Sequence, residues 1–432
     1  TTSELPDAAY AQMRNVLCNT PGIANFLDVV EFPLGDFDAI AASTVALWGE
    51  RLAGKRFVVR CKRSGQHDFR SNDVERFVGA VLLQETAAAG VDLHHPDVTV
   101  RLEIHRDRLL IVNERYEGLG GFPLGGPEPV LSLVSGGFDS TVASYLTMRR
   151  GMKTHFLFFN LGGHAHEVGV KEISLYLWMK YGASHRVKFV SVPFDGVVGE
   201  ILKQVDNSYM GVVLKRMMLR AASTIADEMD IKALVTGEAV AQVSSQTLTN
   251  LAVIDEVTNT LILRPLIASD KTDIIRLSRE IGAEDFSANI PEYCGVISVK
   301  PKTAARLGKV VQQESKFDFS VLETAIATRR TVPLDEIDLD ADTAPDLEVL
   351  GSPLAESVII DVRHPGEAER SPLRLGTNTV MEIPFYELHG RFEDLDQGLR
   401  YMLYCDKGVM SKLHASHLLE EGYSNVCVYR PA

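Results

Sequence analysis

Long apolar runs are missing from this sequence, and cysteine and tryptophan are rare in it. No segment reaches about 18 consecutive apolar residues, so we expect no transmembrane helix. No signal peptide opens the chain, and only five cysteines occur among its 432 residues. An odd number of cysteines in a chain of this size indicates a reducing compartment instead of a disulfide framework. We therefore expect a cytoplasmic protein with no membrane partner.

Positive charge is also scarce overall, but it is unevenly distributed. Lysine and arginine number 44 against 58 acidic residues, and the net charge of −14 argues against attraction of the whole protein to nucleic acid. Residues 51–70 nevertheless carry seven bases and one acid, whereas residues 331–356 carry eight acids and no base. The basic stretch could hold RNA by its phosphates, or it could be a solvated face.

Two large regions differ in their pattern of apolar residues. Residues 1 to about 120 predict an α+β region, with strands at 56–60 and 98–104 and a helix that starts at 71–75. From 129 to about 319, buried-type strands alternate with helical segments. This alternation predicts a parallel sheet that is covered by helices on both faces.

Linkers and a third, smaller region complete the chain. The stretch 118–129 is rich in glycine and proline, and the acidic segment 331–356 has low complexity and three prolines, so both are typical of linkers. After them, strands at 358–360 and 401–404 and a helix at 411–420 predict a small α/β unit.

A glycine-rich hexapeptide follows the first strand of the second region. It is Ser135-Gly136-Gly137-Phe138-Asp139-Ser140, and a helix from 141 to 150 comes directly after it. Glycines let a backbone approach a phosphate closely, and a helix N-terminus offers free N–H groups. The two serines add hydroxyl donors. The context predicts a phosphate-binding loop, although a glycine-rich turn without a ligand would share the local pattern.

Two other motifs are weaker. Residues 49–55 approach a Walker loop, but Arg56 follows where a serine or threonine should bind magnesium, and the segment precedes a strand instead of following one. His164 and His166 suggest a metal site, yet no third ligand stands at a usable spacing. We therefore expect no metal site built from the protein's own side chains.

Two of the cysteines stand in distinct surroundings. Cys405 follows a strand and precedes a helix, with Lys407 two residues further on, and this position predicts a reactive, thiolate-like sulfur. Cys294 lies in the segment 291–298 without comparable signals, and its residues alone favour a buried, inert thiol.

These motifs resemble those of known families. The hexapeptide resembles the signature of the pyrophosphate-loop ATPases, and the segment 405–411, with 358–363 upstream, resembles a rhodanese domain. From about Ile23 to its end, the chain resembles the bacterial tRNA 4-thiouridine synthetase family, also known as thiamine-biosynthesis sulfurtransferases. Further matching segments are Lys62–Phe69, Arg115–Pro123, Gly211–Met218, Thr236–Ala239, Gln242–Thr247 and Leu263–Leu266.

The resemblance implies an α/β multidomain protein. It places a remnant of a ferredoxin-like domain at 1–10, an α+β THUMP RNA-binding domain at 11–117 and a linker at 118–129. A doubly wound, parallel-sheet pyrophosphate-loop ATPase domain would then occupy 130–320, an acidic linker 321–356 and a small α/β rhodanese domain 357–432. Within the THUMP domain, the residues expected to contact tRNA are Arg56, Arg60, Lys62, Arg63 and Arg70.

The resemblance also implies roles in binding ATP and Mg²⁺, without any prosthetic group. Asp139 would serve adenylation through Mg²⁺. Lys271 would stabilise phosphate charge, although its residues alone also allow an ordinary surface lysine. The residues expected to bind ATP are Leu133, Val134, Ser135, Gly136, Gly137, Asp139, Ser140, Lys215, Gly237 and Gln246.

The implied reaction uses ATP to make 4-thiouridine in tRNA. ATP would adenylate the C4 oxygen of uridine eight, with loss of pyrophosphate. Cys405 would receive sulfur as a persulfide from a pyridoxal-phosphate cysteine desulfurase, and this sulfur would displace AMP, directly or as released sulfide. Cys294 would then form a transient disulfide with Cys405. The persulfide would also supply the sulfur-carrier protein of thiamine synthesis, and a homodimer would let one tRNA contact two subunits.

Three alternatives remain open from the sequence. Another pyrophosphate-loop adenylating synthetase would not need Cys294 or Cys405. A tRNA-binding protein without catalytic activity would not need the intact hexapeptide. A pure sulfur carrier for thiamine synthesis would use Cys405 and leave the ATPase domain vestigial.

Overall fold

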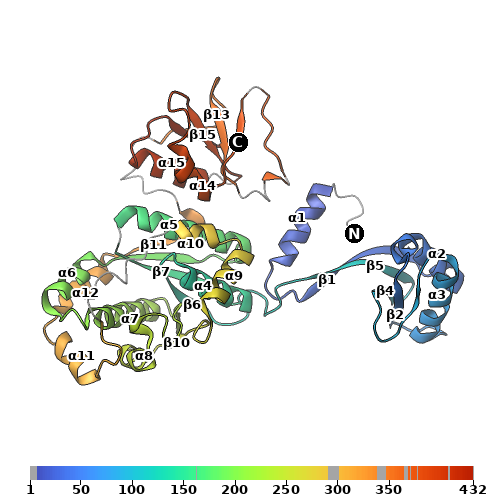
Figure 1. The fold of residues 1–432 in the computed structure, drawn as a ribbon, viewed down its shortest axis with the longest axis horizontal. Coiled ribbons are helices and arrows are strands. Elements are labelled where there is room, and N and C mark those ends of the chain that lie inside the picture. Colours follow the sequence, from blue (N-terminus) through green and yellow to red (C-terminus); the bar gives the residue numbers. More distant parts are fainter. Residues whose placement is uncertain are drawn as a thin grey trace. The chain divides into compact units, whose positions relative to one another are not determined.

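A computed structural model describes residues 7–161, 163–289, 301–337, 347–363, 368–369, 371–376, 378–406 and 409–431. The chain divides into two compact units (Figure 1). One unit consists of Ile23–Leu119, which we call the small unit. The other consists of residues 1–22 and 120–432 and contains two further sheets. We describe the two units separately.

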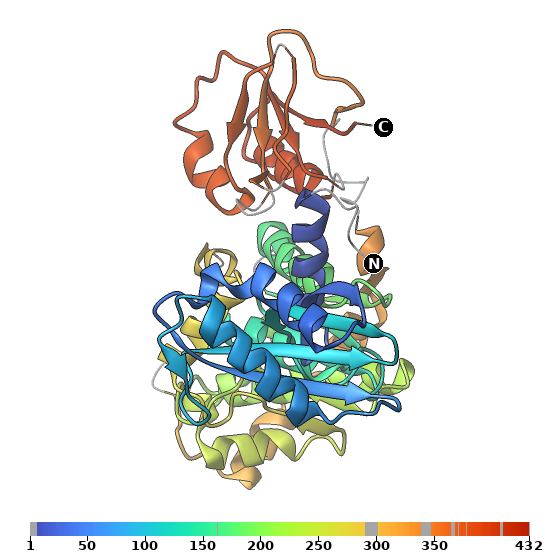
Figure 2. The ribbon, with the colours of Figure 1, turned by 90° about the vertical axis from the view of Figure 1, so that its right-hand side faces the viewer.

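The small unit is an α+β fold, as the sequence predicts. Its sheet has the order β1-β5-β4-β2-β3, in which β2 is parallel to β3 and β4, and the other pairs are antiparallel. Two helices cover one face of this sheet (Figures 1 and 2). The elements are β1 Asn25–Pro33, α2 Phe37–Trp48, η1 Glu50–Leu52, β2 Arg56–Ser64, α3 Ser71–Glu85, β3 Gly90–Val91, β4 Val98–His105 and β5 Arg108–Glu117.

Local signals explain these elements. Asp36 caps α2, because its side chain accepts a hydrogen bond from the N–H of Ala39 at 2.9 Å. Strand β2 buries Phe57, Val58, Val59 and Cys61, whereas its basic residues Arg56, Arg60 and Lys62 are exposed and Arg63 is half-buried. The basic stretch of the sequence is thus largely the outward side of one strand.

The N-terminal segment belongs with the larger unit. Helix α1 spans Asp7–Cys18, and the chain after it pairs with the 118–129 stretch through a hydrogen bond from the N–H of Gly22 to the carbonyl of Gly120 at 2.8 Å. The compact small unit therefore begins at Ile23, whereas the sequence interpretation begins the THUMP domain at residue 11. Residues 1–6 lie outside the described part of the chain.

The larger unit contains a six-stranded sheet, which we call the middle sheet. Its order is β10-β9-β6-β7-β8-β11, and every pair is parallel except β8 and β11. The strands are β6 Val130–Val134, β7 Thr154–Asn160, β8 Lys188–Pro193, β9 Ala233–Val235, β10 Leu261–Leu263 and β11 Arg330–Pro333. The helices are α4 Phe138–Arg150, α5 Gly163–Tyr181, α6 Asp195–Gln204, α7 Met210–Glu228, η2 Ser244–Gln246, α8 Leu248–Asp255, α9 Lys271–Glu280, α10 Glu284–Asn289, α11 Leu307–Glu314 and α12 Phe319–Ala327.

Helices cover both faces of the middle sheet, so the prediction of a doubly wound sheet is confirmed (Figure 1). Helices α4, α5, α9 and α10 contact one another on one side, and α6, α7, α8, α11 and α12 do so on the other. Neighbouring residues of β6 belong to different layers, because Val130 packs in the cluster with α4 and α9, and Leu131 packs in the cluster with α7. Burial on both faces explains the continuous apolar strands of the sequence.

The acidic linker is shorter than the sequence predicts. Its range 321–356 contains most of α12, the strand β11 and η3 Leu334–Glu336, which belong to the middle sheet and its surroundings. It also contains β12 Val349–Leu350, which pairs with the last strand of the chain. Strands of two and four residues are too short to show an alternating apolar pattern. They could therefore not be recognised within this acidic segment. Residues 338–346 lie outside the described part.

The third region forms a parallel sheet, which we call the C-terminal sheet. Its order is β12-β16-β15-β13-β14, and all of its pairs are parallel. The expected strands at 358–360 and 401–404 and the expected helix at 411–420 are confirmed. The remaining elements are β13 Val358–Asp361, β14 Val380–Glu382, α14 Phe385–Phe392, β15 Tyr401–Tyr404, α15 Val409–Glu420 and β16 Val426–Tyr429. Among the described residues, no helix has both the length and the apolar composition that crossing a bilayer requires.

Candidate active site

The glycine-rich loop joins the central strand β6 to helix α4. Gly136 has a φ of +84°, in the left-handed region that a side chain disfavours. Gly137 is the N-cap of α4, with extended backbone angles. The first N–H groups of a helix have no acceptor within it, and the helix dipole places positive charge there. The loop and the start of α4 therefore form an anion-binding geometry, as the sequence predicts.

The two serines of the loop bond to each other. The N–H of Ser135 donates to Ser140 Oγ at 3.1 Å, and the two hydroxyl oxygens lie 3.2 Å apart. Ser140 Oγ also donates to the carbonyl of Gly137 at 3.2 Å, and Ser140 is buried. Ser140 thus braces the loop from within, in addition to any contact that it makes with a ligand.

Asp139, in the first turn of α4, meets two side chains from distant parts of the sequence. Lys271 Nζ lies 3.0 Å from each carboxylate oxygen, and Gln242 Nε2 donates to one of them at 2.8 Å. Lys271 is the first residue of α9, and its ammonium lies 5.5 Å from the centre of the Phe138 ring. The structure thereby brings together an acid and a lysine that lie 132 positions apart.

Gly237 packs directly against the first turn of α4, and the space there admits no side chain. An added Cβ would stand 2.5 Å from the backbone carbon of Asp139 and 2.5 Å from the backbone nitrogen of Ser140. Gly237 follows β9, which lies next to β6 in the sheet, so both chain segments leave the same edge. The glycine allows the two segments to touch.

An ion-pair chain that the sequence analysis did not identify runs beside Gly237. Glu238 is buried and accepts from Lys215 Nζ at 2.6 Å and from Arg264 Nε at 2.9 Å. Arg264 in turn contacts both oxygens of Asp255, at 3.0 and 2.5 Å. Burial alone would raise the pKa of Glu238, but Lys215 and Arg264 outweigh it and lower the pKa to about 2. Signals for this ion-pair chain were present in the sequence, because Glu238 lies shortly after a buried strand, and Glu238 and Arg264 stand in the family-matching segments 236–239 and 263–266.

The remaining residues expected to bind ATP lie close to these elements. Leu133 and Val134 end β6, immediately before the loop. Gln246 ends η2 and is 8% exposed, and its Oε1 has no hydrogen-bond partner among the described residues. A buried amide oxygen without a partner costs about 1–3 kcal/mol, so this position suits a ligand that donates a hydrogen bond.

His166, considered above only for a metal site, contacts the loop. Its Nε2 lies 3.1 Å from the carbonyl oxygen of Ser135, and its ring packs edge-on against Phe158. Burial lowers the pKa of His166, so the neutral ring donates to this carbonyl. The side chain of His164 lies outside the described part, and the described residues contain no group of three His, Cys, Asp or Glu side chains suited to a metal ion.

Cys405 lies in a second strand–loop–helix junction, between β15 and α15. Its side chain is buried, and its Sγ accepts from the N–H of Ser411 at 3.4 Å and lies 3.5 Å from the Ser411 hydroxyl. The sulfur is therefore held by a backbone donor near the start of α15. Lys407 lies outside the described residues, so its expected contribution is not observed.

Charged residues fix the loop around Cys405. Arg363 is buried and pairs with Asp361 at 2.6 Å and with Asp406 at 2.8 Å. The hydroxyl of Tyr404 donates to Asp406 at 2.9 Å, and burial together with this bond raises the pKa of Tyr404 to about 12. Asp406 follows Cys405 directly, so the arginine anchors the loop next to the sulfur.

Cys294, which the resemblance assigns to catalysis, lies within 290–300, outside the described residues. The cysteines that the structure describes are all free thiols. Burial raises the pKa of Cys61 to about 11 and also raises the pKa of Cys427. These two thiols are therefore poor nucleophiles.

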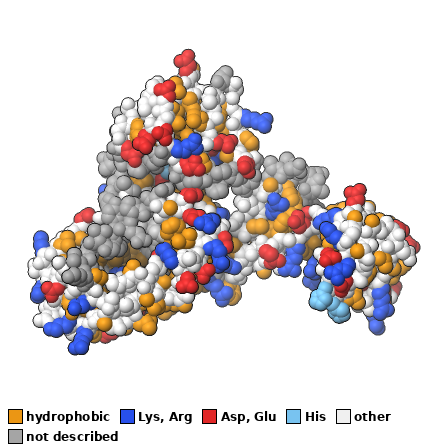
Figure 3. All heavy atoms as spheres, viewed as in Figure 1, with side chains coloured by type: hydrophobic (Ala, Val, Ile, Leu, Met, Phe, Trp, Pro, Cys, Tyr) orange, Lys and Arg blue, Asp and Glu red, His pale blue; other side chains and the backbone are white. Residues whose placement is uncertain are grey.

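The basic residues of the small unit lie on or near β2, and acids partly neutralise them. Arg56 pairs with two aspartates, at 3.0 and 3.3 Å, and Arg60 lies 3.9 Å from a glutamate. Arg63 contacts a histidine ring, Lys62 is exposed, and the backbone N–H of Arg70 donates to the carboxylate of Asp73 in the first turn of α3. Figure 3 shows blue and red side chains interspersed on this unit.

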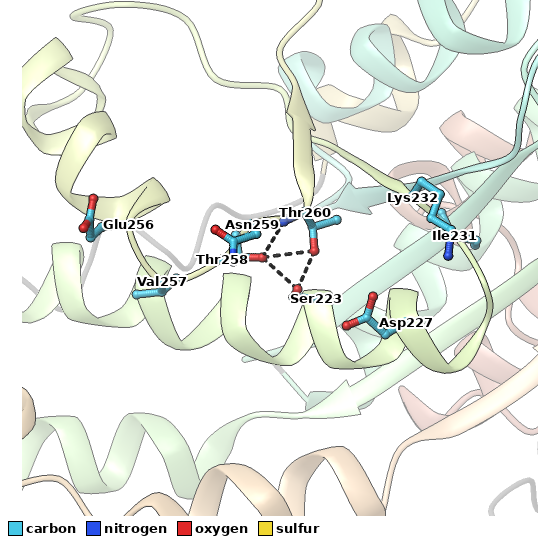
Figure 4. Close-up of a pocket in the computed structure, with 9 residues that line it drawn as sticks. All are labelled: Ser223, Asp227, Ile231, Lys232, Glu256, Val257, Thr258, Asn259 and Thr260. Carbon is cyan, nitrogen blue, oxygen red and sulfur yellow. Dashed lines mark hydrogen bonds between the residues drawn. The ribbon is translucent and has the colours of Figure 1, made fainter.

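A pocket of about 470 Å³ lies elsewhere on the middle sheet (Figure 4). Three of its lining hydroxyls, from Ser223, Thr258 and Thr260, bond to one another within 3.0 Å. Residues directly before β9 and β10 line it, so it opens at the amino ends of the strands. The loop and Glu238 follow the carboxyl ends, where ligands of such sheets bind. The pocket is therefore separate from the candidate active site.

Two family models match the chain. One is described as "Thiamine biosynthesis protein (ThiI)" and matches residues 125–319, and the other is the THUMP domain, which matches residues 35–113. The matches coincide with the middle sheet and with most of the small unit.

Curated proteins match over nearly the whole chain. The tRNA sulfurtransferase of Pseudomonas aeruginosa (strain LESB58) is 57% identical and covers 100% of this chain and 89% of its own length. That of Azotobacter vinelandii is 55% identical and covers 98% of this chain and 87% of its own length. Among solved structures, a 4-thiouridine synthetase–RNA complex with bound ATP is 26% identical, has a TM-score of 0.66, and covers 77% of this chain and 86% of that chain.

Proposed function

The chain belongs to the tRNA sulfurtransferase family, and from this premise we propose that it makes 4-thiouridine at position eight of tRNA at the expense of ATP. ATP would be cleaved to AMP and pyrophosphate. The observation that carries the proposal is the junction of β6 and α4, where an anion-binding loop leads to an aspartate held by Lys271 and Gln242.

Nucleotide binding would use the residues around this junction. Backbone N–H groups of residues 136–140, at the N-terminus of α4, would hold phosphate oxygens, and Lys215 and Lys271 would add positive charge. The unpaired Oε1 of Gln246 would accept a hydrogen bond from the adenine amino group. Leu133 and Val134, at the end of β6, would border the adenine base, because they directly precede the loop.

Asp139 suits a magnesium site as well as a lysine. Its carboxylate supplies the hard oxygen ligands that Mg²⁺ prefers, and its side chain is 18% exposed. A bound Mg²⁺ would neutralise charge on the departing pyrophosphate. Lys271 would then leave Asp139 and turn toward the phosphates. The ion pair in the structure keeps both side chains beside the phosphate-binding loop.

The role of ATP is to activate a poor leaving group. The C4 oxygen of uridine would attack the α phosphorus, and pyrophosphate would leave with the electron pair of the broken bond. The adenylated C4 oxygen could then leave as AMP. Electrostatic stabilisation of the transferring phosphoryl group is the main contribution that the protein can make to this step.

Sulfur would arrive at C4 from a Cys405 persulfide. The terminal sulfur attacks C4 and AMP departs, which leaves a Cys405–S–S–C4 linkage. The thiolate of Cys294 then attacks Cys405 Sγ, the thiouridine leaves, and a Cys294–Cys405 disulfide remains. A dithiol reductant supplies two electrons to restore both thiols. Release of free sulfide to attack C4 would give the same products.

The cradle around Cys405 supports the carrier role. The N–H of Ser411 faces the sulfur at 3.4 Å, and burial of Cys405 limits access by water. A rhodanese-type function for the C-terminal sheet rests on this cradle. The sulfur would come from a pyridoxal-phosphate cysteine desulfurase, whose product is a persulfide on the accepting cysteine.

The THUMP domain would position the tRNA. Arg60, Lys62, Arg63 and Arg70 would contact phosphates, whereas Arg56 is held by two aspartates and would contribute less. A homodimer, in which one tRNA spans two subunits, is part of this proposal.

A second function follows from the same carrier site. The family model that matches residues 125–319 is described by thiamine biosynthesis, and Cys405 could pass its sulfur to the adenylated C-terminus of a sulfur-carrier protein. A thiocarboxylate on that protein, formed in the presence of the Asp139→Ala variant, would support a role that does not need the loop.

Reconstitution tests the main proposal. The full chain is incubated with unmodified tRNA, ATP, cysteine, a cysteine desulfurase and a dithiol, and the tRNA is digested for nucleoside analysis. We expect 4-thiouridine at position eight and an equal amount of AMP. The proposal fails if the wild-type chain forms neither product, and AMP without thiouridine would indicate a different adenylating synthetase.

A further inference from the structure

Glu238 stands at the same edge of the middle sheet as the loop, yet no step above uses it. It follows Gly237, whose backbone touches Asp139 and Ser140. Its Oε1 lies 2.6 Å from Lys215 Nζ, and its Oε2 accepts from Arg264 at 2.9 Å and from the Thr236 hydroxyl at 3.1 Å. Both carboxylate oxygens are therefore engaged by side chains of the protein.

The burial of Glu238 would be unfavourable without its cations. The residue is 7% exposed, and an ionised carboxylate in such a place needs charge and hydrogen bonds around it. Lys215 and Arg264 provide both, and the low pKa of Glu238 keeps it ionised at every physiological pH. A charged acceptor of this kind holds its donors firmly.

Arg264 is fixed on its other side as well. Its two terminal nitrogens contact Asp255, the last residue of α8, so the guanidinium is clamped between two carboxylates. A planar fork held at both ends has little freedom. The chain Asp255–Arg264–Glu238 thus ends in a carboxylate whose position is set by the fold.

Lys215 is the partly exposed end of this chain. It lies in the second turn of α7, and its side chain is 23% exposed. A lysine side chain loses rotamer freedom worth up to about 2 kcal/mol when it is ordered, and Glu238 imposes that ordering before any ligand arrives. An ammonium has three N–H donors, so the bond to Glu238 leaves two for phosphate oxygens.

We propose that Glu238 is a positioning residue that orients Lys215 toward the triphosphate of ATP, with Arg264 and Asp255 holding Glu238 in place. The proposal rests on the proposed function, because it takes Lys215 to meet the nucleotide. It makes the affinity for ATP depend on a carboxylate that never touches ATP.

A second buried glutamate that pairs with α7 provides a control. It distinguishes an effect on the position of Lys215 from a general effect on stability. Glu314 is also buried, and it bridges Arg216 and Arg220 of α7 at 2.6 to 3.0 Å. Arg216 further donates to the carbonyl of Val253. None of these residues belongs to the candidate active site. Glu314→Gln therefore removes a buried negative charge, as Glu238→Gln does, but leaves the partner of Lys215 unchanged.

The experiment measures binding of α,β-methylene-ATP, which cannot be cleaved at the reacting bond, to the full chain. We expect Glu238→Gln to raise the dissociation constant about tenfold and Glu314→Gln to change it less than about twofold. Urea unfolding of both variants shows whether their stability losses are similar. If Glu238→Gln binds the analogue like wild type, or if Glu314→Gln weakens binding equally, the proposal is overturned.

A double-mutant cycle tests the route through Lys215. We expect Lys215→Ala to weaken binding at least about tenfold, and Glu238→Gln to add nothing in that background, because its target is gone. Additive effects would overturn the proposal. Should Glu238→Gln fail to fold, Arg264→Lys keeps the charge but loses the fork, and we expect it to weaken binding about threefold; wild-type binding by this variant would contradict the anchoring role.

Failure of the proposed function is distinguishable from failure of this inference. Wild-type protein that binds the analogue but makes no 4-thiouridine would contradict the function and leave the cycle interpretable. Wild-type protein that makes 4-thiouridine while Glu238→Gln keeps normal affinity would contradict only the inference.

Discussion

The two strand–loop–helix junctions of the larger unit solve a similar problem by different means. Between β6 and α4, glycine conformations and a helix start create an anion-binding loop, Lys271 of α9 pairs with its aspartate, and Lys215 of α7 pairs with Glu238 beside Gly237. Between β15 and α15, a single sulfur accepts one backbone N–H, and the charges that hold the loop lie at Asp406 and Arg363. Several distant segments meet at the first junction, whereas the second adds one distant arginine, Arg363, 43 positions before Asp406, to its local residues.

This difference follows from the ligand each junction would hold. A triphosphate spreads its charge over many oxygens, so several donors must converge on it from several strand ends. A persulfide concentrates its charge on sulfur, and a short loop can surround it. Distant residues should therefore matter more for the first junction than for the second.

Removing Cys405 should produce the largest effect and separate the two junctions completely. We expect Cys405→Ala to lower multiple-turnover 4-thiouridine formation at least about 10³-fold, because no other described thiol can carry the sulfur there. Binding of α,β-methylene-ATP should stay unchanged. Cys18→Ser, which removes a thiol elsewhere, is the control, and many turnovers by Cys405→Ala would refute the carrier role.

Asp139→Asn should impair the junction between β6 and α4 and leave the junction at Cys405 intact. We expect AMP and 4-thiouridine formation to fall about 10²–10³-fold, since the variant loses the charge that Lys271 and Mg²⁺ would meet. Persulfide loading of Cys405, followed by alkylation and mass spectrometry, should be normal. Asp273→Asn in α9 is the control, because Asp273 is exposed and pairs with Arg276, one helical turn away. Impaired loading in Asp139→Asn would show that the junctions are not independent.

The sequence predicted what is local in these junctions. The hexapeptide follows a buried strand and enters a helix, and Cys405 does the same, so both could be recognised from adjacent residues. Gly136 and Gly137 have the conformations that such a loop requires. The alternating pattern also predicted the parallel sheet and its two helical layers.

Contacts between distant segments could not be predicted in the same way. Only family resemblance pointed to Lys271, and nothing local announced that Gln242 or Lys271 would reach Asp139. Glu238 and Arg264 lie in segments that match the family, but nothing local indicated that the two would pair. The role of Cys294 stays a prediction, since it lies outside the described residues.

A methyl group at Gly237 should test how closely the distant segments must approach. We expect Gly237→Ala to cost about 1–3 kcal/mol in ATP binding, because a Cβ would stand 2.5 Å from two backbone atoms of the first turn of α4. Equilibrium binding of the analogue measures this loss. Gly199→Ala, in helix α6 with no atom nearby, should instead raise stability by up to about 1 kcal/mol. Equal binding by Gly237→Ala and wild type would mean that the segments can separate freely.

Acid should lower the stability of the middle sheet, with a smaller effect than the substitutions above. Burial lowers the pKa of His155 to about 4, and its Nδ1 accepts from the N–H of Lys188. A folded pKa below the unfolded value of about 6.5 means that stability is complete above pH 6.5 and falls as the pH drops toward 4. We expect a loss of roughly 1–2 kcal/mol at pH 5, measured by urea unfolding.

Substitution can assign this acid sensitivity. His155→Asn keeps an acceptor beside β8 but does not titrate, so its loss between pH 7 and pH 5 should be smaller than that of wild type. His94→Asn, on the exposed surface of the small unit, should leave the wild-type loss unchanged. An identical pH response in His155→Asn would assign the acid sensitivity to other groups.

Strand β11 has a consequence for how the chain avoids self-association. A parallel sheet that ended at β8 would present an open row of backbone donors and acceptors, which is a template for strands of other molecules. The chain returns after α12 and covers β8 with an antiparallel strand of four residues, whose last residue, Pro333, cannot donate a further hydrogen bond. A chain cut before Arg330 would keep every catalytic residue proposed for the middle sheet and still expose that row. We therefore expect its aggregation, and the minimal ATP-binding fragment should extend through Pro333.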